Sequence, residues 1–146
     1  MKAHLQRVSR ASVAVDDQTI ASIEKGLLVL LAIEHGDSEV QADWLAKKTS
    51  SLRIFPSDDK EMDLSVSDIG GSVLVISQFT LAADIRKGNR PNFSNAAEPE
   101  LAAPLVARFV TTLQNYVTDV CEGEFGANMQ VSLTNDGPVT MLLERQ

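Results

Sequence analysis

Residues 27–33 read LLVLLAI, the longest unbroken apolar run in the chain. A strand with one face in water alternates apolar and polar residues, whereas this run has no polar position. It is also far shorter than the ~20 apolar residues that a helix needs to cross a bilayer. The run therefore predicts a central strand that is covered on both faces.

A second strand of the same kind is expected at residues 72–77, SVLVIS, which lead directly into SQFTL at 77–81. Between the two apolar strands, Ser38 and Gln41 have the spacing of a capping box and predict a helix that runs to about residue 51. A short strand, RIF, is expected at 53–55.

The N-terminal part of the chain alternates polar and apolar residues in three short segments, at 3–8, 11–15 and 19–24. They are separated by Ser9-Arg10 and by the polar residues 16–18. This pattern predicts antiparallel strands in a meander.

A longer amphipathic helix is predicted between residues 101 and 120, where apolar residues recur at helical spacing. Pro99 fits the first helical turn, whereas Pro104 is expected to kink the helix or to mark its true start. Gly123 and Gly126 are expected to end it.

The order of strands, helix, strands, helix and strands predicts an α/β fold, with mixed or antiparallel β-sheets and two main helices packed on one side. The 146 residues form a single expected domain, residues 1–146, because this length matches one domain with a real core. A second copy of the chain would cover exposed sheet edges, so a homodimer is expected.

The charge of the chain restricts its partners. A formal net charge of −7 disfavours broad coating of DNA or RNA, so any contact with nucleic acid must be local. Cations gather at Arg86, Lys87 and Arg90, where the simplest interpretation is a solvated surface loop.

Cysteine and histidine are scarce, which limits the chemistry available. Cys121 is the single cysteine and has no partner for a disulfide, and only His4 and His35 could join it in a metal site. We therefore expect no metal and no cofactor. The first ten residues lack the apolar region of a secretory signal, so a cytoplasmic protein with no membrane span is expected.

Two short motifs remain, and each has an ordinary structural interpretation. NDGPVT at 135–140 lies between the expected strands MQVSL (129–133) and VTMLL (139–143), and Asp-Gly and Gly-Pro pairs favour a turn. SQFTL could be no more than a polar strand end. Nevertheless, active groups often follow the carboxyl ends of strands, where backbone N–H groups can bind an anionic oxygen.

Together these two motifs resemble the paired signatures of the D-aminoacyl-tRNA deacylase family, which checks chirality in translation. Asn89 and Asn92 depart from the family pattern, because relatives often have Arg and Ser at these positions of the basic loop. The resemblance spans nearly the whole chain, through QRV (6–8), ASV (11–13), GLLVLLAIE (26–34), RIF (53–55), GGSVLVISQFTLAAD (70–84), RP-F-S (90–94) and FGANMQVSL-NDGPVT (125–140).

The resemblance implies hydrolysis of the ester that joins a D-amino acid, or glycine, to tRNA. It implies that the Gly137-Pro138 peptide is cis and reaches across a homodimer into the pocket of the partner subunit. Rigid carbonyls there would hold the amino group and leave no room for an L side chain, whichever amino acid is attached.

The family pattern also implies a set of substrate-binding residues. Arg7 would hold the Gly137-Pro138 segment, and Phe125 would flank the terminal adenine. The remaining positions are Met129 in the same pocket, Ser77 of the SQFTL motif, and Asn135 and Thr140 of the NDGPVT motif.

For the chemistry, the backbone N–H groups of Phe79 and Thr80 are candidates to stabilise the oxyanion. Gln78 and Thr80 could position the ester or the water, but no His, Asp or Cys in a motif is an obvious general base. The resemblance favours help from the 2′-hydroxyl of the substrate's own ribose. The alternatives are a noncatalytic module that binds RNA 3′ ends, a small-molecule esterase that uses Thr80 as nucleophile, and a purely structural dimer.

Overall fold

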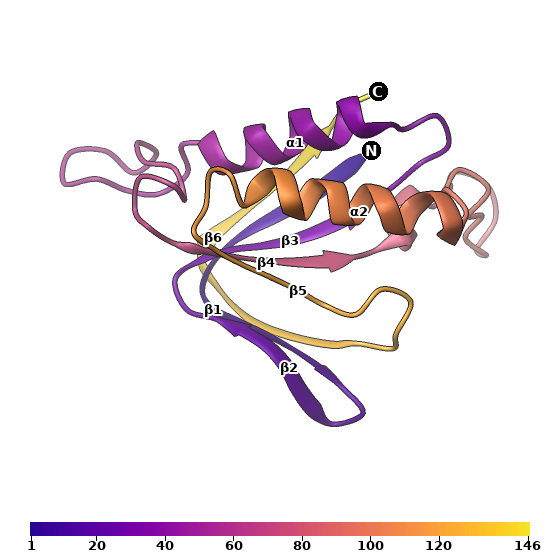
Figure 1. Cartoon of the computed structure of the whole chain (residues 1–146), viewed down its shortest axis with the longest axis horizontal. Coiled ribbons are helices and arrows are strands. Elements are labelled where there is room, and N and C mark those ends of the chain that lie inside the picture. Colours follow the sequence, from indigo (N-terminus) through magenta and orange to yellow (C-terminus); the bar gives the residue numbers. More distant parts are fainter.

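The computed structural model describes all 146 residues. It contains one six-stranded mixed sheet whose strands follow the order β2-β1-β3-β4-β5, with β6 paired to β1 (Figure 1). The elements are β1 Lys2–Val15, β2 Gln18–Ile23, β3 Gly26–Ala32, α1 Glu39–Ser51, β4 Ser72–Ser77, the short 3-10 helix η1 Phe79–Ala82, α2 Pro99–Leu113, β5 Asp119–Glu122 and β6 Gln130–Glu144.

The apolar run at 27–33 forms the central strand β3, as predicted. β3 pairs antiparallel with β1 on one side and parallel with β4 on the other. Leu27 contributes to the core beneath the helices, whereas Leu28 contributes to a second core on the opposite face. Gly26 lets the two parallel strands start close together, because a Cβ there would lie 1.8 Å from the carbonyl oxygen of Ser72.

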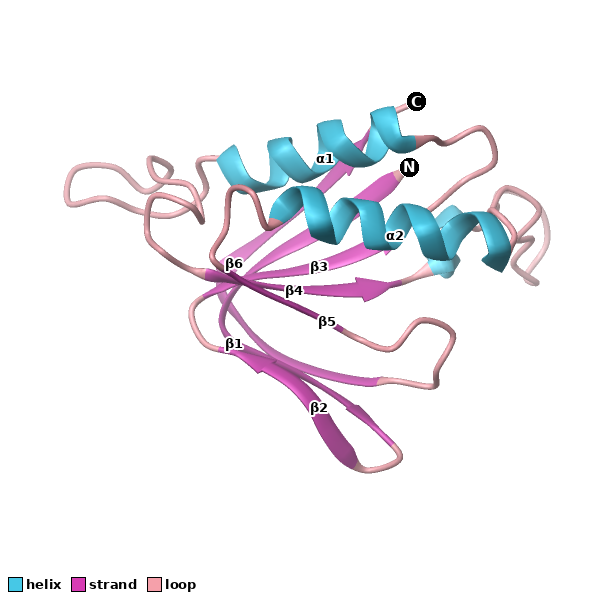
Figure 2. Ribbon diagram, viewed as in Figure 1, coloured by secondary structure: helices cyan, strands magenta, loops and turns pink.

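Both helices connect parallel strands and pack on the same face of the sheet (Figure 2). The predicted capping box of α1 is confirmed: Val40 N–H donates to Ser38 Oγ (3.3 Å), and Ser38 N–H donates to Gln41 Oε1 (3.0 Å). α2 begins at Pro99 and continues through Pro104, which therefore does not mark its start. The predicted fold class, an α/β domain with a mixed sheet and two helices on one side, is confirmed.

The two faces of the sheet are covered in different ways. Twenty-four buried residues form the main core between the helices and the sheet, with Phe55 and Phe109 fully buried in it. On the other face, the second half of β1 curls under the sheet with β2 and the first half of β6 (Figure 1), and seven residues form a smaller core there. The sheet is therefore nearly closed at this end.

The N-terminal meander contains one strand fewer than predicted. Residues 3–8 and 11–15 form one strand, because Ser9 and Arg10 are exposed but remain extended. β1 leaves β3 at the pair Val8 and Gly26 and joins β2 at the pair Ala11 and Ile23. The predicted strand at 19–24 is confirmed as β2.

Two further predictions, one of a short strand and one of a helix end, were wrong. The expected RIF strand does not form, and Phe55 makes only an isolated bridge with Leu64. The second helix ends at Leu113 rather than near residue 120, and the short strand β5 follows it. Gly123 and Gly126 therefore lie after β5 and do not end the helix.

The NDGPVT motif lies inside one strand, not between two. β6 pairs with β1 on both sides of the motif, from Gln6 with Thr140 to Val8 with Asn135. Two steps along β1 thus correspond to five along β6, so the motif forms a bulge that leaves the ladder and returns to it. The turn residues serve this bulge instead of a hairpin.

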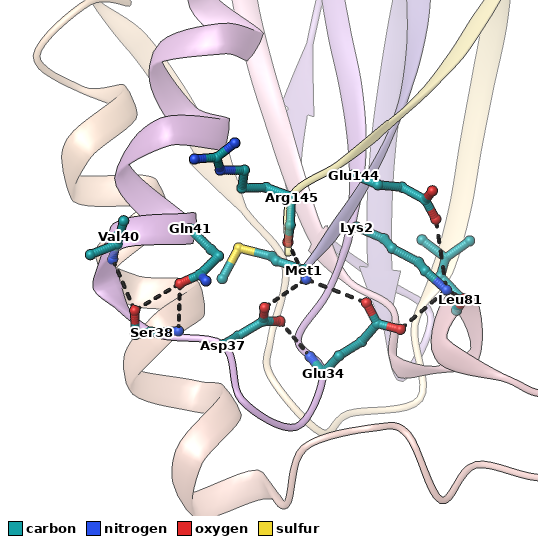
Figure 3. A network of polar contacts seen from close by, with 10 residues as sticks. All are labelled: Met1, Lys2, Glu34, Asp37, Ser38, Val40, Gln41, Leu81, Glu144 and Arg145. Carbon is teal, nitrogen blue, oxygen red and sulfur yellow. Dashed lines mark hydrogen bonds and ion pairs between the residues drawn. The ribbon is translucent and has the colours of Figure 1, made fainter.

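A polar network ties the ends of several strands together (Figure 3). The α-ammonium group of Met1 is buried and contacts Asp37 Oδ1 (2.7 Å), Glu34 Oε2 (3.3 Å) and the carbonyl oxygen of Arg145 (2.9 Å). Next to it, Lys2 Nζ contacts Glu34 (3.1 Å) and donates to the carbonyl oxygen of Leu81 in η1 (3.4 Å). The network therefore anchors the segment that follows β4.

Neither α-helix has the length and apolarity that a membrane span requires.

Candidate active site

A cavity of about 590 Å³ opens where β3 and β4 end. Leu31 and Ile76 contribute from the two strands, Ala102 and Val106 from α2, and the loop 125–129 also lines the cavity. Thirteen of its nineteen lining residues are hydrophobic, so the cavity suits a largely apolar or aromatic ligand.

Five of the residues predicted for the site line this cavity. They come from two segments that are about fifty positions apart in the sequence, and the fold brings them together: Ser77, Gln78, Phe79, Phe125 and Met129.

The SQFTL motif changes from strand to helix at its second residue. β4 ends at Ser77, the N–H of Gln78 donates to the carbonyl oxygen of Leu31 (2.8 Å), and η1 begins at Phe79. The first N–H groups of a helix have no partner within it. The N–H groups of Phe79 and Thr80 donate to no other group of the chain, so two neighbouring donors remain available to a ligand.

Thr80 is exposed on η1, and its hydroxyl has a defined partner. The side-chain amide of Gln78 donates a hydrogen bond to Thr80 Oγ1 (2.5 Å). No carboxylate, imidazole or thiol contacts this hydroxyl in the structure, so no side chain in contact with Thr80 could act as its general base.

Three exposed aromatic rings are associated with the cavity. Phe79, Phe93 and Phe125 are 58%, 38% and 42% exposed, and all three line the cavity. The rings of Phe79 and Phe93 meet edge to face, with 5.1 Å between their centroids. Such exposed aromatic faces are suited to stacking against a base.

Sequence reasoning did not single out Phe93, nor the cavity residues Glu98, Ala102 and Val106. Phe93 belongs to the RP-F-S motif at 90–94, so that motif was the available signal. The helix residues carry none, because apolar positions at helical spacing are expected in any core. Glu98 is the only charged residue that lines the cavity.

The bulge at 135–140 is fixed by Arg7 and by its own first residue. Arg7 is buried, and its guanidinium donates to the carbonyl oxygens of Asp136 (2.8 Å) and Ile54 (2.6 Å). The amide of Asn135 donates to Thr140 Oγ1 (2.9 Å) and accepts from Val139 N–H (2.7 Å). The bulge is therefore closed across its base.

Gly137 and Pro138 form the exposed tip of this bulge, and the peptide bond between them is cis. Gly137 has φ +144°, a region that side chains rarely adopt. A Cβ there would lie 2.8 Å from Val139 Cγ2 and 3.1 Å from Arg7 Nη2. Only glycine fits this position without displacing its neighbours.

Within one chain, the bulge and the cavity do not meet. Arg7 pairs with Leu27 at the start of β3, whereas Ser77 pairs with Leu31 near its end. Four residues of strand correspond to about 13 Å. The predicted residues Arg7, Gly137, Pro138, Asn135 and Thr140 thus form one group, and the cavity residues form another.

The electrostatics offer neither a metal site nor an activated thiol. No group of three His, Cys, Asp or Glu side chains could hold a metal ion. Burial and the neighbouring Asp119 raise the pKa of the Cys121 thiol, which disfavours the thiolate that a nucleophile requires.

Comparisons with known proteins find relatives of this chain. Residues 4–144 match the family model described as D-Tyr-tRNA(Tyr) deacylase. A D-aminoacyl-tRNA deacylase of Roseiflexus castenholzii is 55% identical over 144 residues, which cover 99% of this chain and 92% of that protein.

Two solved structures have a similar fold. One is described as c-Myc DNA Unwinding Element Binding Protein, with a TM-score of 0.95 and 39% identity, covering 100% of this chain and 99% of that chain. The other is described as a probable eukaryotic D-amino acid tRNA deacylase, with a TM-score of 0.83, 16% identity and 97% coverage of each chain, and it shows the fold alone.

Proposed function

The chain belongs to the D-Tyr-tRNA(Tyr) deacylase family and is therefore a hydrolase, and from this premise we propose how it cleaves the ester of D-aminoacyl-tRNA. The reaction releases the free D-amino acid and the tRNA, and it removes residues of the wrong hand before translation uses them. Glycyl-tRNA is a second expected substrate. A cytoplasmic location fits this role.

One observation carries the proposal: the two unpartnered N–H groups of Phe79 and Thr80 at the end of a strand that borders the cavity. When water attacks the ester carbonyl carbon, negative charge develops on the carbonyl oxygen. Donors that already point at that position stabilise the tetrahedral intermediate, typically by about 3–4 kcal/mol for one donor. The ribose oxygen then leaves and takes up a proton.

The cavity supports the same substrate. Its volume, about 590 Å³, falls in the range of small-molecule sites and suits an aminoacyl-adenosine. We assign the adenine to the exposed ring of Phe125, with Met129 beside it. An aromatic face and a thioether accept a base without reading a sequence, which suits a 3′ end that many RNAs share.

The bulge completes the site from a second copy of the chain. Its tip at Gly137 and Pro138 is exposed, and it lies too far from the cavity of its own chain to touch the same ligand. We therefore assign Gly137 and Pro138 to the cavity of the partner subunit, as carbonyl acceptors for the substrate's amino group. We assign positions beside that amino group to Ser77 and to the two residues in the arms of the bulge, Asn135 and Thr140.

The open face of the sheet supports this dimer. His4 lies away from the helices, in one row with its strand partners Leu30 and Leu142. Leu142 is 52% exposed, and the Nδ1 atom of His4 is buried without a hydrogen-bond partner. An apolar row with an orphaned polar atom is suited to burial against another surface.

The position of that row also relates the two parts of the site. Along β1, Lys2 contacts the η1 segment and Gln6 pairs with Thr140 at the bulge, so His4 lies halfway between the two. A two-fold axis near His4 would exchange these ends, and it would bring the bulge of one copy to the cavity of the other.

Chiral selection then needs no side-chain pocket. When backbone carbonyls hold the amino group of a D-amino acid, the hydrogen on its α-carbon faces the bulge. In an L-amino acid the side chain would take that position and collide with the main chain. A D side chain would point outward, whatever its chemistry. Selection by main-chain sterics therefore accepts many D-amino acids and also glycine.

The water is activated without a side-chain base in this proposal. The 2′-hydroxyl of the terminal ribose is the nearest group on the substrate that could take part, and Gln78 with Thr80 would orient the ester. The alternative, Thr80 as a covalent nucleophile, is disfavoured because its oxygen already accepts a hydrogen bond from Gln78 and contacts no base.

Two noncatalytic roles compete with this proposal. One is an RNA 3′-end binding module. The other is DNA binding, because the solved structure with TM-score 0.95 is that of a protein named for binding a DNA unwinding element. The net charge of −7 disfavours a broad DNA interface on this chain.

The test is a set of time courses with purified protein and D-tyrosyl-, L-tyrosyl- and glycyl-tRNA. Release of D-tyrosine and glycine with L-tyrosine spared is the expected pattern. Binding of tRNA without release of any amino acid would support the RNA 3′-end binding module instead. Equal cleavage of D-tyrosyl- and L-tyrosyl-tRNA would refute selection by the bulge.

A further inference from the structure

A loop rich in cations directly precedes Phe93, which lines the cavity, and no part of the reaction above uses this loop. This basic loop, residues 84–92, is closed at its base by two backbone hydrogen bonds between Asp84 and Asn92, of 2.7 and 3.0 Å. It projects beyond the first turn of α2, at the side of the molecule where β3 and β4 end (Figure 1).

The loop is directly connected to the cavity wall. Phe93 follows the closing residue Asn92, lines the cavity and touches the ring of Phe79. Three extended residues span at most about 11 Å, so Lys87 and Arg90 both lie within that distance of the closed base. Their long side chains extend the reach further.

The three cations of the loop are not equivalent. Arg86 donates to both carboxylate oxygens of Asp84, at 2.9 and 2.7 Å, and this pairing lowers the pKa of Asp84 well below its usual range. Arg86 is therefore neutralised within the loop. Lys87 and Arg90 are exposed and form no ion pair, so their charges remain available to an anion.

The substrate places anions at this position. With its terminal adenosine in the cavity, an RNA 3′ end must leave through the mouth, and the phosphodiesters just before that adenosine are its first groups outside. We propose, on the basis of the function given above, that Lys87 and Arg90 bind these phosphates. In a chain of net charge −7, two unpaired cations at the mouth would supply a local attraction that the rest of the surface opposes.

A binding experiment tests the loop independently of catalysis. The probe is a short RNA without an attached amino acid that ends in single-stranded CCA. It is titrated at several salt concentrations against the wild-type chain and the variant K87A/R90A. The control variant K47A/K48A removes the same charge from exposed, unpaired lysines near the end of α1, on the opposite side of the molecule in Figure 1.

We expect K87A/R90A to bind the RNA about tenfold more weakly at low salt, while K47A/K48A binds as the wild type does. The plot of log affinity against log salt should become shallower by about 1.4, which is about 0.7 for each lost phosphate contact on a single strand. Equal effects of the two variants would overturn the proposal, and so would tighter binding of duplex DNA than of this RNA.

A kinetic ratio locates the contact on the phosphates. The ratio of kcat/KM for D-tyrosyl-tRNA to kcat/KM for D-tyrosyl-adenosine, which carries no phosphate, should fall about tenfold in K87A/R90A. An unchanged ratio would refute the assignment. If the wild-type chain cleaves neither ester, the proposed function fails, and the salt-dependent binding still decides the role of the loop.

Discussion

The side-chain amide of Gln78 donates a hydrogen bond to the hydroxyl oxygen of Thr80, 2.5 Å away. A hydroxyl that accepts one hydrogen bond keeps its own hydrogen as a donor. The Thr80 hydroxyl is therefore prepared to donate to an ester or a water, and its oxygen is a poorer nucleophile than an unbonded one.

From this relationship we predict that Thr80→Ala slows hydrolysis of D-tyrosyl-tRNA by about tenfold or less. One hydrogen bond of about 1 kcal/mol is lost, while the backbone N–H of residue 80 remains. Steady-state kinetics give the measure, with Thr80→Ser as the control that keeps the hydroxyl. Complete loss of activity, together with an acyl-enzyme trapped in the wild type and seen by mass spectrometry, would assign Thr80 as the nucleophile.

The tip of the bulge leads to a second prediction. Gly137→Ala should lower kcat/KM for D-tyrosyl-tRNA about a hundredfold, because its Cβ would collide with Val139 and Arg7 and move the carbonyls of the bulge. Gly70→Ala is the control, since Gly70 also has a positive φ, +61°, but a Cβ there would meet nothing within 4 Å. Thermal unfolding checks that both variants fold, and wild-type rates in Gly137→Ala would discredit the bulge as part of the site.

A third prediction concerns the open sheet face. Leu142→Lys should convert dimers to monomers, because it would bury two charges across the proposed two-fold axis, and it should abolish hydrolysis with it. Leu101→Lys provides a matched control, because Leu101 is 45% exposed but lies on α2. Light scattering gives the mass in solution. An active Leu142→Lys monomer would rule out a site shared between two chains.

The fourth prediction concerns pH and the packing of the two helices. Arg108 and Thr112 on α2 donate to Asp43 on α1, and hydrogen bonding by these groups lowers the pKa of Asp43 to about 2. Because the folded pKa lies below the unfolded value of about 3.9, the stabilisation is present above pH 4 and is lost as the pH falls toward 2.

Asp43→Asn should therefore lower the free energy of unfolding by about 0.5–1 kcal/mol at neutral pH, a small amount because the pair is partly exposed. The difference from the wild type should shrink between pH 4 and pH 2. Urea unfolding at a series of pH values measures it, and a difference that is constant over this range would contradict the assignment to Asp43.

The parts of the fold that could be predicted are those with a strong local signal. LLVLLAI and SVLVIS are too apolar to be half-exposed strands, and Ser38 with Gln41 marks a helix start directly. β5 could not be recognised, because Val117 and Val120 continue the helical spacing of α2 and four residues are too few to display a strand period. The bulge looks like the junction of two strands, because Asp-Gly and Gly-Pro serve both purposes.

The residues of the candidate site also divide into those that the sequence indicates and those that it does not. SQFTL was recognisable because it follows an apolar strand, and NDGPVT because the family motif carries it. The separation of the two motifs within one chain was not recognisable, since it depends on the antiparallel register of β1 with β3 and β6. Glu98 enters the cavity from a helix start that has no periodicity, so only the folded chain identifies it, whereas the RP-F-S motif at 90–94 was the available signal for Phe93.

The distance between bulge and cavity has a genetic consequence. If each catalytic centre takes its bulge from one chain and its cavity from the other, a chain defective in Gly137 and a chain defective in the SQFTL strand end can rescue one another. Their mixed dimer would hold one centre with both lesions and one with neither, so two dead alleles would complement when expressed together.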